Sequence, residues 1–153
     1  MLNTFIKKTS QLAITSLLIS GLSSVSIIAL LSSNVMAAEL TINVKDININ
    51  EGHLMVALFS GSESYKQNKA GWSSMLKVNG EHEVLSFKDL PNGEYALKLF
   101  HDENDNKKLD LNMLGIPKEN YGFSNNVGRF GQPSYEEARF LVKENTNIEI
   151  NLF

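Results

Sequence analysis

Residues 83–101, EVLSFKDLPNGEYALKLFH, hold the pattern that decides the fold class of this chain. Apolar and polar side chains alternate in both halves of the stretch, and the apolar ones are Leu85, Phe87, Tyr95, Leu97 and Leu99. Alternation with a period of two is typical of a strand with one buried face. Pro91-Asn92-Gly93 separates the halves and favours a tight turn. The stretch therefore predicts two β-strands joined by a turn.

Similar strand patterns recur along the rest of the chain. They predict seven short strands in all, at residues 40–45, 53–60, 76–78, 83–88, 94–101, 138–142 and 148–152. The segment 53–60, HLMVALFS, is apolar on both faces, which is typical of a central strand covered on both sides. Asn79-Gly80 favours a type I′ hairpin between the third and fourth strands.

Only short helical turns are expected. Residues 61–72 lose the alternation and predict a loop with one helical turn near 63–68, whose Tyr65 and Trp72 fold back onto the sheet. Ser134 precedes Glu137 by three residues, the spacing of a capping box, which predicts a second turn.

These elements predict an all-β fold. Seven strands with turn signals at short spacing favour a seven-stranded antiparallel β-sandwich, with a long structured loop between the fifth and sixth strands. A partly closed barrel is the alternative.

Residues 1–37 are predicted to be a signal peptide. A basic start and an apolar run over 12–31 are followed by Val35-Met36-Ala37, whose small residues suit signal peptidase. We expect cleavage after Ala37 or Ala38, leaving one domain over 38–153 with no membrane span. The protein would then be exported to the periplasm or the extracellular space of a bacterium. The apolar run is long, so an uncleaved membrane anchor is the alternative.

Charge and cysteine content narrow the class of protein. Lys7 and Lys8 leave with the leader, so 12 basic and 17 acidic side chains remain, a formal charge of −5. The lysines are scattered and offer no basic stripe for nucleic acid. Cysteine is absent, which rules out disulfides and a lipid-modified N-terminal cysteine. We therefore expect packing alone to hold the fold.

Residues 101–133, HDENDNKKLDLNMLGIPKENYGFSNNVGRFGQP, form a connection longer than compact domains usually carry without a function. Carboxylates, amides and glycines are mixed with apolar and aromatic side chains, and so much apolar surface predicts a folded loop. Binding residues often lie on such loops, so the 102–135 loop is the predicted functional region.

The start of this loop predicts a calcium site. Asp102, Asn104, Asn106 and Asp110 hold the first, third, fifth and ninth positions of a pattern like the EF-hand loop. Lys108, at the seventh position, would contribute its backbone carbonyl. Calcium binds several oxygens at once, and it is the one cofactor that the sequence suggests.

The calcium pattern is incomplete, which makes a weak site the expectation. The sixth position is Lys107 instead of glycine, and the twelfth is Met113 instead of glutamate. We expect a dissociation constant on the order of 10⁻⁴–10⁻³ M. Glu119 is a more distant candidate ligand. The alternative is an ion-free turn, in which the same side chains accept hydrogen bonds from nearby backbone amides.

A second candidate site lies later in the loop. Its members are aromatic, amide and guanidinium side chains, namely Tyr121, Phe123, Asn125, Asn126, Arg129 and Phe130. Aromatic faces and amides suit a sugar ring or a peptide, which predicts ligand binding. The alternative is that the aromatic residues attach the loop to the end of the sandwich.

His101, Asp102 and Glu103 are candidates for an acid–base or metal-dependent hydrolytic site. Adjacent strand residues point to opposite faces, so His101 and Asp102 are not expected to converge. The alternative for His101 is a core histidine that is hydrogen-bonded to the loop. The chain has no HExxH motif, nucleophile elbow or phosphate-binding glycine loop, and we expect a protein that is not an enzyme.

The ordered run of motifs resembles a bacterial family known as domain of unknown function 2141. The resembling segments are FKDLPNGEYA at 87–96, FHDEN at 100–104, LD at 109–110, LGIPKE at 114–119 and YGFSNN at 121–126. The resemblance covers essentially the whole chain after the leader. It implies an exported protein with an immunoglobulin-like or transthyretin-like sandwich, and it implies no activity. Lys107 stands where members tend to carry glycine.

The sequence thus predicts an exported, non-enzymatic β-sandwich that binds a ligand or an envelope protein through its 102–135 loop. The first alternative is a structural envelope module that pairs through a strand edge, with 147–153 as the pairing strand. The second alternative is a metal-dependent hydrolase built on His101, Asp102 and Glu103.

Overall fold

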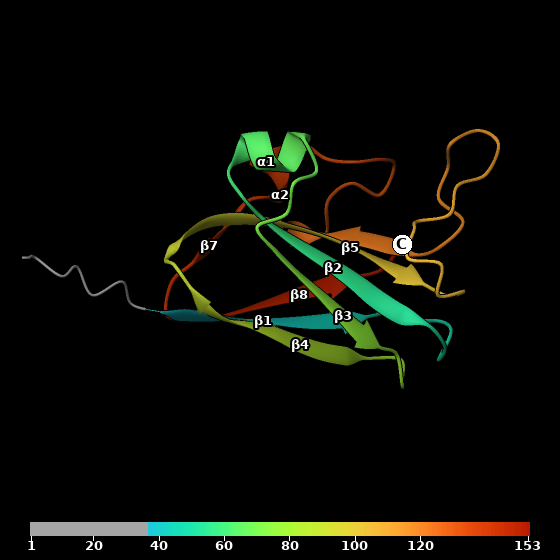
Figure 1. The fold of residues 1–153 in the computed structure, drawn as a ribbon, viewed down its shortest axis with the longest axis horizontal. Coiled ribbons are helices and arrows are strands. Elements are labelled where there is room, and N and C mark those ends of the chain that lie inside the picture. The colour runs from blue at the N-terminus through green and yellow to red at the C-terminus, as the bar shows by residue number, and fades with distance from the viewer. Residues whose placement is uncertain (1–36) are drawn as a thin grey trace, which may run out of the picture. The chain divides into compact units, whose positions relative to one another are not determined.

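The computed structural model describes residues 37–153, which form two β-sheets (Figure 1). Sheet A has the strand order β4 (Glu83–Leu90), β1 (Ala38–Lys45), β8 (Asn145–Asn151). Sheet B has the order β3 (Trp72–Lys77), β2 (His53–Ser60), β5 (Gly93–Asp102), β6 (Tyr121–Phe123). The short strand β7 (Phe140–Val142) also pairs with β5. The predicted signal peptide, apart from Ala37, lies outside the described residues.

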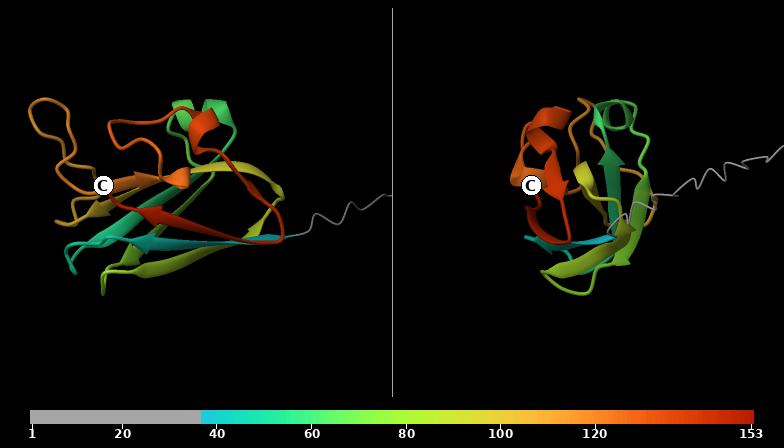
Figure 2. Two further views of the ribbon diagram at one scale, coloured as in Figure 1. Left: turned by 180° about the vertical axis from the view of Figure 1, so that it is seen from behind. Right: turned by 90° about the vertical axis from the view of Figure 1, so that its left-hand side faces the viewer.

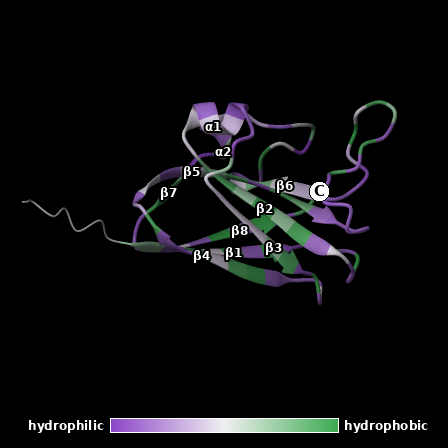
Figure 3. Cartoon of the chain, viewed as in Figure 1, coloured by the Kyte–Doolittle hydropathy of each residue, from purple (hydrophilic) through white to green (hydrophobic). Residues whose placement is uncertain are grey.

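The two sheets bury one common core. Leu40, Ile42 and Val44 of β1 are fully buried, and they belong to the same apolar cluster as Leu54 and Leu97 from sheet B. Figure 3 shows apolar segments along the strands and polar segments over the short helix beside β2. The mostly β fold in two layers was therefore correctly predicted, because each sheet needs the other to cover its apolar face.

Two details of the predicted sandwich are wrong. Residues 37–153 form eight strands instead of the seven predicted, because β6 forms inside the segment predicted as a loop. Sheet A is mixed instead of antiparallel, because β1 pairs with β8 in parallel, with Ile42 opposite Ile148. Alternation along a strand specifies which side chains face inward, but it does not specify the neighbouring strand or its direction.

The predicted hairpin at Asn79-Gly80 is also wrong. Strand β3 pairs with β2 in sheet B, whereas β4 pairs with β1 in sheet A. A type I′ turn needs positive φ at both central residues, and neither has it. Instead, the buried Val78 donates its N–H to the carbonyl of Gly52 at 3.1 Å. The segment therefore carries the chain from one sheet to the other.

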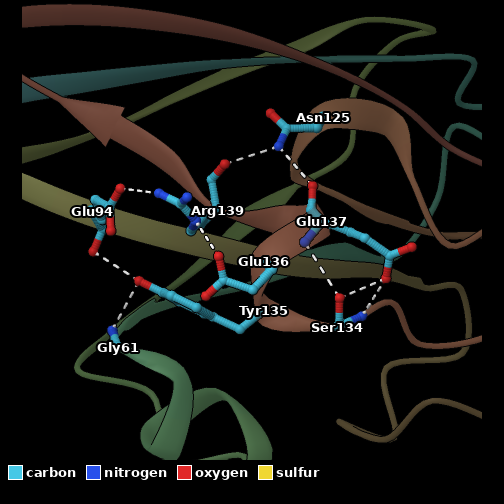
Figure 4. Close-up of polar contacts among 8 residues, drawn as sticks. All are labelled: Gly61, Glu94, Asn125, Ser134, Tyr135, Glu136, Glu137 and Arg139. Atoms are coloured by element: carbon cyan, nitrogen blue, oxygen red, sulfur yellow. Dashed lines mark hydrogen bonds and ion pairs between the residues drawn. The ribbon is translucent and has the colours of Figure 1, made fainter.

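Three short helical turns form, of which the first and the third were correctly predicted and the second was not. They are α1 (Ser62–Lys66), the 3₁₀ turn η1 (Ser124–Asn126) and α2 (Tyr135–Ala138). The capping box is present, because Ser134 accepts the N–H of Glu137 at 3.4 Å and the Glu137 carboxylate accepts the N–H of Ser134 at 2.8 Å (Figure 4).

A small second core joins α1 to α2. The Tyr65 ring packs edge-on against Phe59 and Tyr135, with ring centroids 5.4 and 5.9 Å away. The Tyr135 hydroxyl accepts the Gly61 N–H and donates to the Glu94 carbonyl (Figure 4). Trp72 begins β3 instead of ending a loop, and it packs on Tyr95 with centroids 5.5 Å apart. The helical turns are thus tied to β2 and β5, the two central strands of sheet B.

In residues 37–153, no helix combines the length and the apolar composition that crossing a bilayer requires. Figure 2 shows that α1, α2 and the two long loops all stand on one side of the sheets.

Gly52 provides a test of this packing. Its φ is +71°, and a β-carbon there would lie 2.0 Å from the backbone oxygen of Asp102. We expect Gly52→Ala to lower the free energy of unfolding by about 2–4 kcal/mol, because strain and overlap add. Gly115 has a similar φ of +76° and nothing within 4 Å, so Gly115→Ala should cost only about 1 kcal/mol. Urea denaturation would measure the free energy of unfolding of both variants. Equal decreases would contradict the close approach inferred at Gly52.

Candidate functional site

The outer face of sheet B forms the floor of an open groove of about 560 Å³. Strand parity decides which side chains line it, because successive residues point to opposite faces. In β2, Leu54 and Leu58 face the core, whereas Met55 and Ala57 face the groove. Segment 53–60 is therefore apolar on both faces because one face meets the core and the other meets the groove.

Strand register arranges the floor in two rows. In the first row, Met55 lies between Met75 and Phe100, and Phe100 is paired with Tyr121. In the second row, Ala57 lies between Ser73 and Lys98, and Lys98 is paired with Phe123. Cross-strand neighbours of this kind are in side-chain contact distance. The floor is thus apolar and aromatic, with one ammonium group in its second row.

Loops form the walls of the groove. Asn68, just after α1, lines one side, and Lys107, Lys108 and Gln132 line others. The groove lining contains three lysines and no acidic side chain, although the chain after residue 37 carries more acidic than basic residues. None of the three lysines makes an ion pair within residues 37–153. The groove is therefore a positive site on a negatively charged protein.

Lys98 is held in place by neutral groups. Its Nζ donates to the Tyr65 carbonyl and to Asn68 Oδ1, both at 3.0 Å, and lies 4.1 Å from the centroid of the Tyr65 ring. Burial lowers the pKa of this ammonium from its ordinary value. A half-buried cation without a carboxylate partner is suited to meet an anion that enters from outside.

The predicted calcium residues come together at the start of the loop. Asp102 is buried, and its carboxylate accepts the N–H groups of Asn106 and Lys107 at 3.1 and 2.8 Å. One oxygen of Asp110 accepts the side-chain amides of Asn104 and Asn106 at 2.7 and 3.1 Å. The side chains converge, but much of their hydrogen-bonding capacity is already used within the loop.

Hydrogen bonds between side-chain oxygens and backbone N–H groups stabilise this turn. Asn104 Oδ1 accepts the N–H of Asn106 at 3.1 Å, and Asn106 Oδ1 accepts the N–H of Lys108 at 2.8 Å. Lys107, at the sixth position of the calcium-loop pattern where glycine was expected, takes a φ of +62°. A tight turn therefore forms without glycine, at a cost of about 1 kcal/mol.

Glu119 connects the two ends of the segment. Its side chain is buried, Oε1 accepts the N–H of Glu103 at 3.1 Å, and Oε2 accepts the N–H of Asp110 at 2.9 Å. Charge-assisted bonds to backbone N–H groups are stronger than neutral ones. Glu119 thus holds the 103–110 segment against the segment that returns to β6.

The predicted ligand-binding residues separate into two groups. Tyr121 and Phe123 line the groove, with ring centroids 5.8 Å apart. Asn125 donates to the carbonyls of Glu137 and Arg139 (Figure 4), so its amide nitrogen is used inside the fold.

The other three predicted ligand-binding residues also lie outside the groove lining. Asn126 bonds both the carbonyl of Glu149 and the N–H of Asn151 in β8. The Arg129 carbonyl accepts the Tyr121 hydroxyl at 2.9 Å, and Phe130 is fully exposed.

The candidate hydrolytic residues do not face a common space. His101 is buried, and its Nε2 lies 2.7 Å from the Glu51 carbonyl. Its Nδ1 is 4.0 Å from Glu103, too far for a hydrogen bond. The Asp102 carboxylate accepts the N–H groups of Asn106 and Lys107. Among the residues that the structure describes, no group of three or more His, Asp or Glu is placed to hold a metal ion.

Sequence reasoning missed most of the groove floor. Met55, Ala57, Met75, Lys98 and Phe100 were not singled out as site residues. The available signal was segment 53–60, whose second apolar face indicated an additional cover. The rows themselves depend on the register between four strands, which alternation within one strand does not reveal.

The fold and groove define a two-sheet β protein with a long, ordered loop, and comparison with known proteins identifies its family. The chain belongs to the family described as "Uncharacterized protein conserved in bacteria (DUF2141)", whose model matches residues 42–151. The resemblance predicted from the motifs at 87–126 is thereby confirmed.

One further relative is similar over part of its length. The chain is 30% identical over 104 residues to the protein named "Protein PBN1" of Debaryomyces hansenii, a match that covers 65% of this chain and 22% of that protein. The chain therefore spans about a fifth of the length of this relative. No solved structure matches the chain, and the immunoglobulin-like or transthyretin-like topology stays a prediction.

The bonds of Glu119 can be tested by removing one acceptor. In Glu119→Gln, an amide nitrogen replaces one carboxylate oxygen and leaves a backbone N–H without its partner. We expect the free energy of unfolding to fall by about 1–3 kcal/mol. The exposed Glu81 is a matched control, and Glu81→Gln should change stability by less than about 0.5 kcal/mol. Chemical denaturation would measure both, and a Glu119→Gln protein as stable as wild type would contradict the assignment.

Proposed function

We propose that this protein is an exported, non-enzymatic binding module whose groove on sheet B takes a small amphipathic anion. The observation that supports this is the lining itself, with an apolar floor, three lysines and no acidic side chain. An anion placed there meets three ammonium groups that form no ion pair within residues 37–153. Its apolar body covers a floor that water otherwise wets.

The groove has the dimensions and chemistry of a ligand site. Its volume of about 560 Å³ lies within the usual range for small-molecule pockets, roughly 300–1,000 Å³. Met55 and Met75 supply flexible apolar surface that adapts to different shapes, while Phe100 and Tyr121 supply flat faces. A carboxylate with a medium-length alkyl chain or an aromatic body is the simplest molecule that uses both features.

The 102–135 loop has a specific role in this proposal. It contributes Lys107, Lys108 and Gln132 to the walls, and the bonds of Asp102 and Glu119 keep the first part of it ordered. A wall that is ordered before binding loses less conformational entropy when the ligand arrives. The loop thus acts together with the sheet.

The proposal predicts that laurate binds in the groove. Met75, 54% exposed on the edge strand β3, can be changed to glutamate without disturbing the core. We expect Met75→Glu to weaken laurate binding at least about tenfold, or about 1.4 kcal/mol, because a carboxylate there repels the ligand. Isothermal titration calorimetry would measure this.

Val84 provides the matched control, because it is 58% exposed on the edge strand β4 of sheet A. Val84→Glu adds the same charge outside the groove and should leave laurate binding unchanged. Dodecanol, with the same chain length and no charge, should bind more weakly than laurate. The proposal would be contradicted if Met75→Glu and Val84→Glu weakened laurate binding equally, or if wild-type protein bound dodecanol as tightly as laurate.

A weak calcium site at the start of the loop is a second proposal. It is favoured by the convergence of Asp102, Asn104, Asn106 and Asp110, with the Lys108 carbonyl nearby in sequence. If the two asparagine amides rotate, their carbonyl oxygens face Asp110 and form an oxygen-rich site. The ion then competes with backbone N–H groups for the same oxygens, so the affinity is low.

Calcium titration during thermal unfolding tests this second proposal. At about ten times the dissociation constant, calcium should stabilise the fold by about 1.4 kcal/mol and raise Tm by several degrees. Asp110→Asn should remove most of that shift. Asp105→Asn should keep it, because Asp105 belongs to the same loop but pairs with His53. An unchanged Tm at millimolar calcium would remove the ion from the account.

The two alternatives are supported less well. The structural module was predicted to pair through the strand at 147–153. In β8, however, the Glu149 carbonyl and the Asn151 N–H are already hydrogen-bonded to the Asn126 side chain. The outer edges of β3 and β4 pair with no other strand of the described region, and they are the remaining edges for strand pairing. For the hydrolase, the buried and bonded state of His101 and Asp102 offers no support.

A further inference from the structure

The loop between β5 and β6 ends in a small apolar tip at residues 111–116. The tip is a narrow turn closed by an isolated bridge between Leu111 and Pro117. Met113 and Leu114 are 102% and 83% exposed, and Leu111 and Ile116 are more than half exposed. In Figure 1 this loop, at the upper right, projects from the body of the protein. Large apolar side chains gathered on one convex tip indicate an interaction surface.

The backbone of the tip satisfies its own hydrogen bonds. Asn112 Oδ1 accepts the N–H groups of Leu114 and Ile116 at 2.8 and 3.0 Å. The Asn112 carbonyl accepts the N–H of Gly115 at 3.0 Å, and the Asn112 N–H donates to Ile116 at 2.8 Å. An apolar medium penalises unpaired backbone groups by several kcal/mol each. Four of the six backbone N–H groups of residues 111–116 thus have a partner inside the turn, which lowers this penalty.

Lysines surround the base of the tip. Lys107 and Lys108 precede it and Lys118 follows it, and none of them makes an ion pair within the described part of the chain. The nearby acids are engaged inside the loop, since Asp110 accepts the amides of Asn104 and Asn106. Because the three lysines are exposed and Asp110 is partly buried, the exposed charge at the base of the tip is mostly positive.

The acids next to these lysines are also occupied. Asp105 pairs with His53, Glu119 accepts two backbone N–H groups, and Asp102 accepts two more. Glu103 lies 4.0 Å from His101, beyond hydrogen-bond distance, and is partly buried. These carboxylates keep their charge, but Asp102 and Glu119 are buried and Glu103 and Asp110 are partly buried. Asp105 is therefore the one exposed acid among residues 102–119, against three exposed lysines.

We propose that the 111–116 tip inserts into the surface of a lipid bilayer that carries anionic headgroups. The side chains of Met113 and Leu114 enter the acyl boundary, and Lys107, Lys108 and Lys118 lie at the level of the headgroups. This surface shares Lys107 and Lys108 with the groove wall, but its apolar end, Met113 and Leu114, lies outside the groove lining and does not depend on the proposed ligand.

A bilayer suits the tip better than a pocket on another protein for three reasons. The tip is convex, four of its six backbone N–H groups are bonded within the turn, and its exposed lysines complement an anionic surface. A few apolar side chains bind a membrane only weakly, and attraction of about 1 kcal/mol for each lysine near the surface adds the second contribution that stable association needs.

Vesicle co-sedimentation tests the proposal with the intact domain. Wild-type protein should bind vesicles of phosphatidylcholine mixed with phosphatidylglycerol, and it should bind pure phosphatidylcholine less well. Met113→Ser/Leu114→Ser should lower the partition coefficient at least about tenfold, because the inserted apolar surface is lost. Both residues are exposed, so the fold is not affected.

Leu141→Ser is the matched control, since Leu141 is 61% exposed on β7, at the end of the molecule opposite the tip (Figures 1 and 2). It should bind vesicles as wild type does. The Lys107→Gln/Lys108→Gln variant should bind anionic vesicles more weakly than wild type and pure phosphatidylcholine vesicles equally well. Added salt should remove the same electrostatic contribution to wild-type binding.

Three results would overturn the proposal. The first is wild-type protein that does not bind vesicles, which would assign the tip to a protein partner. The second is a tip variant that binds as well as wild type. The third is binding that Met75→Glu removes and the tip variant does not, which would locate the lipid contact in the groove.

Discussion

The alternation of side chains along β5 is the constraint on which the rest of the structure depends. Its ten residues pair with β2, β6 and β7, so it holds sheet B together. Leu97 and Leu99 point into the core, whereas Lys98 and Phe100 point into the groove. A slip of one residue would exchange these sets and place an ammonium group in the core. The core thereby determines the composition of the binding surface.

The loop is ordered because β5 ends in a buried carboxylate. Asp102 is the last residue of β5 and binds two backbone N–H groups of the following turn, and Glu119 binds two more before the chain enters β6. Backbone groups that would otherwise lack a partner are thus satisfied by side chains. Such a loop can carry the groove wall at one point and present the exposed tip at another. Because the Asp102 oxygens already accept backbone N–H groups, a calcium ion would have to compete for them and would bind only weakly.

The proposed surfaces differ in shape and share a charge. The groove is concave and suits a molecule, while the tip is convex and suits an extended surface. Lys107 and Lys108 lie in the groove wall and at the base of the tip. Because the chain after residue 37 is acidic as a whole, this local positive region would orient the protein toward anions.

The strands were predictable where their pattern is local. Leu85 and Phe87 alternate with polar residues in β4, and Ser134 and Glu137 form their capping box within one turn. The start of the loop was also recognisable, because Asp102 and Asp110 belong to one contiguous motif. Met55 and Met75 could not be assigned to a site in the same way, since they lie on different strands and meet only through register.

The sequence by itself determined that this chain is mostly β, which side chains of each strand face inward, and where its long loop lies. Those properties follow from neighbours a few residues apart, whose chemistry decides local conformation and burial. The tertiary structure alone decided that β3 and β4 belong to different sheets, that β1 and β8 run in parallel, and that four strands align to form a groove. Such choices depend on contacts between distant segments, and many pairings bury the same apolar faces equally well.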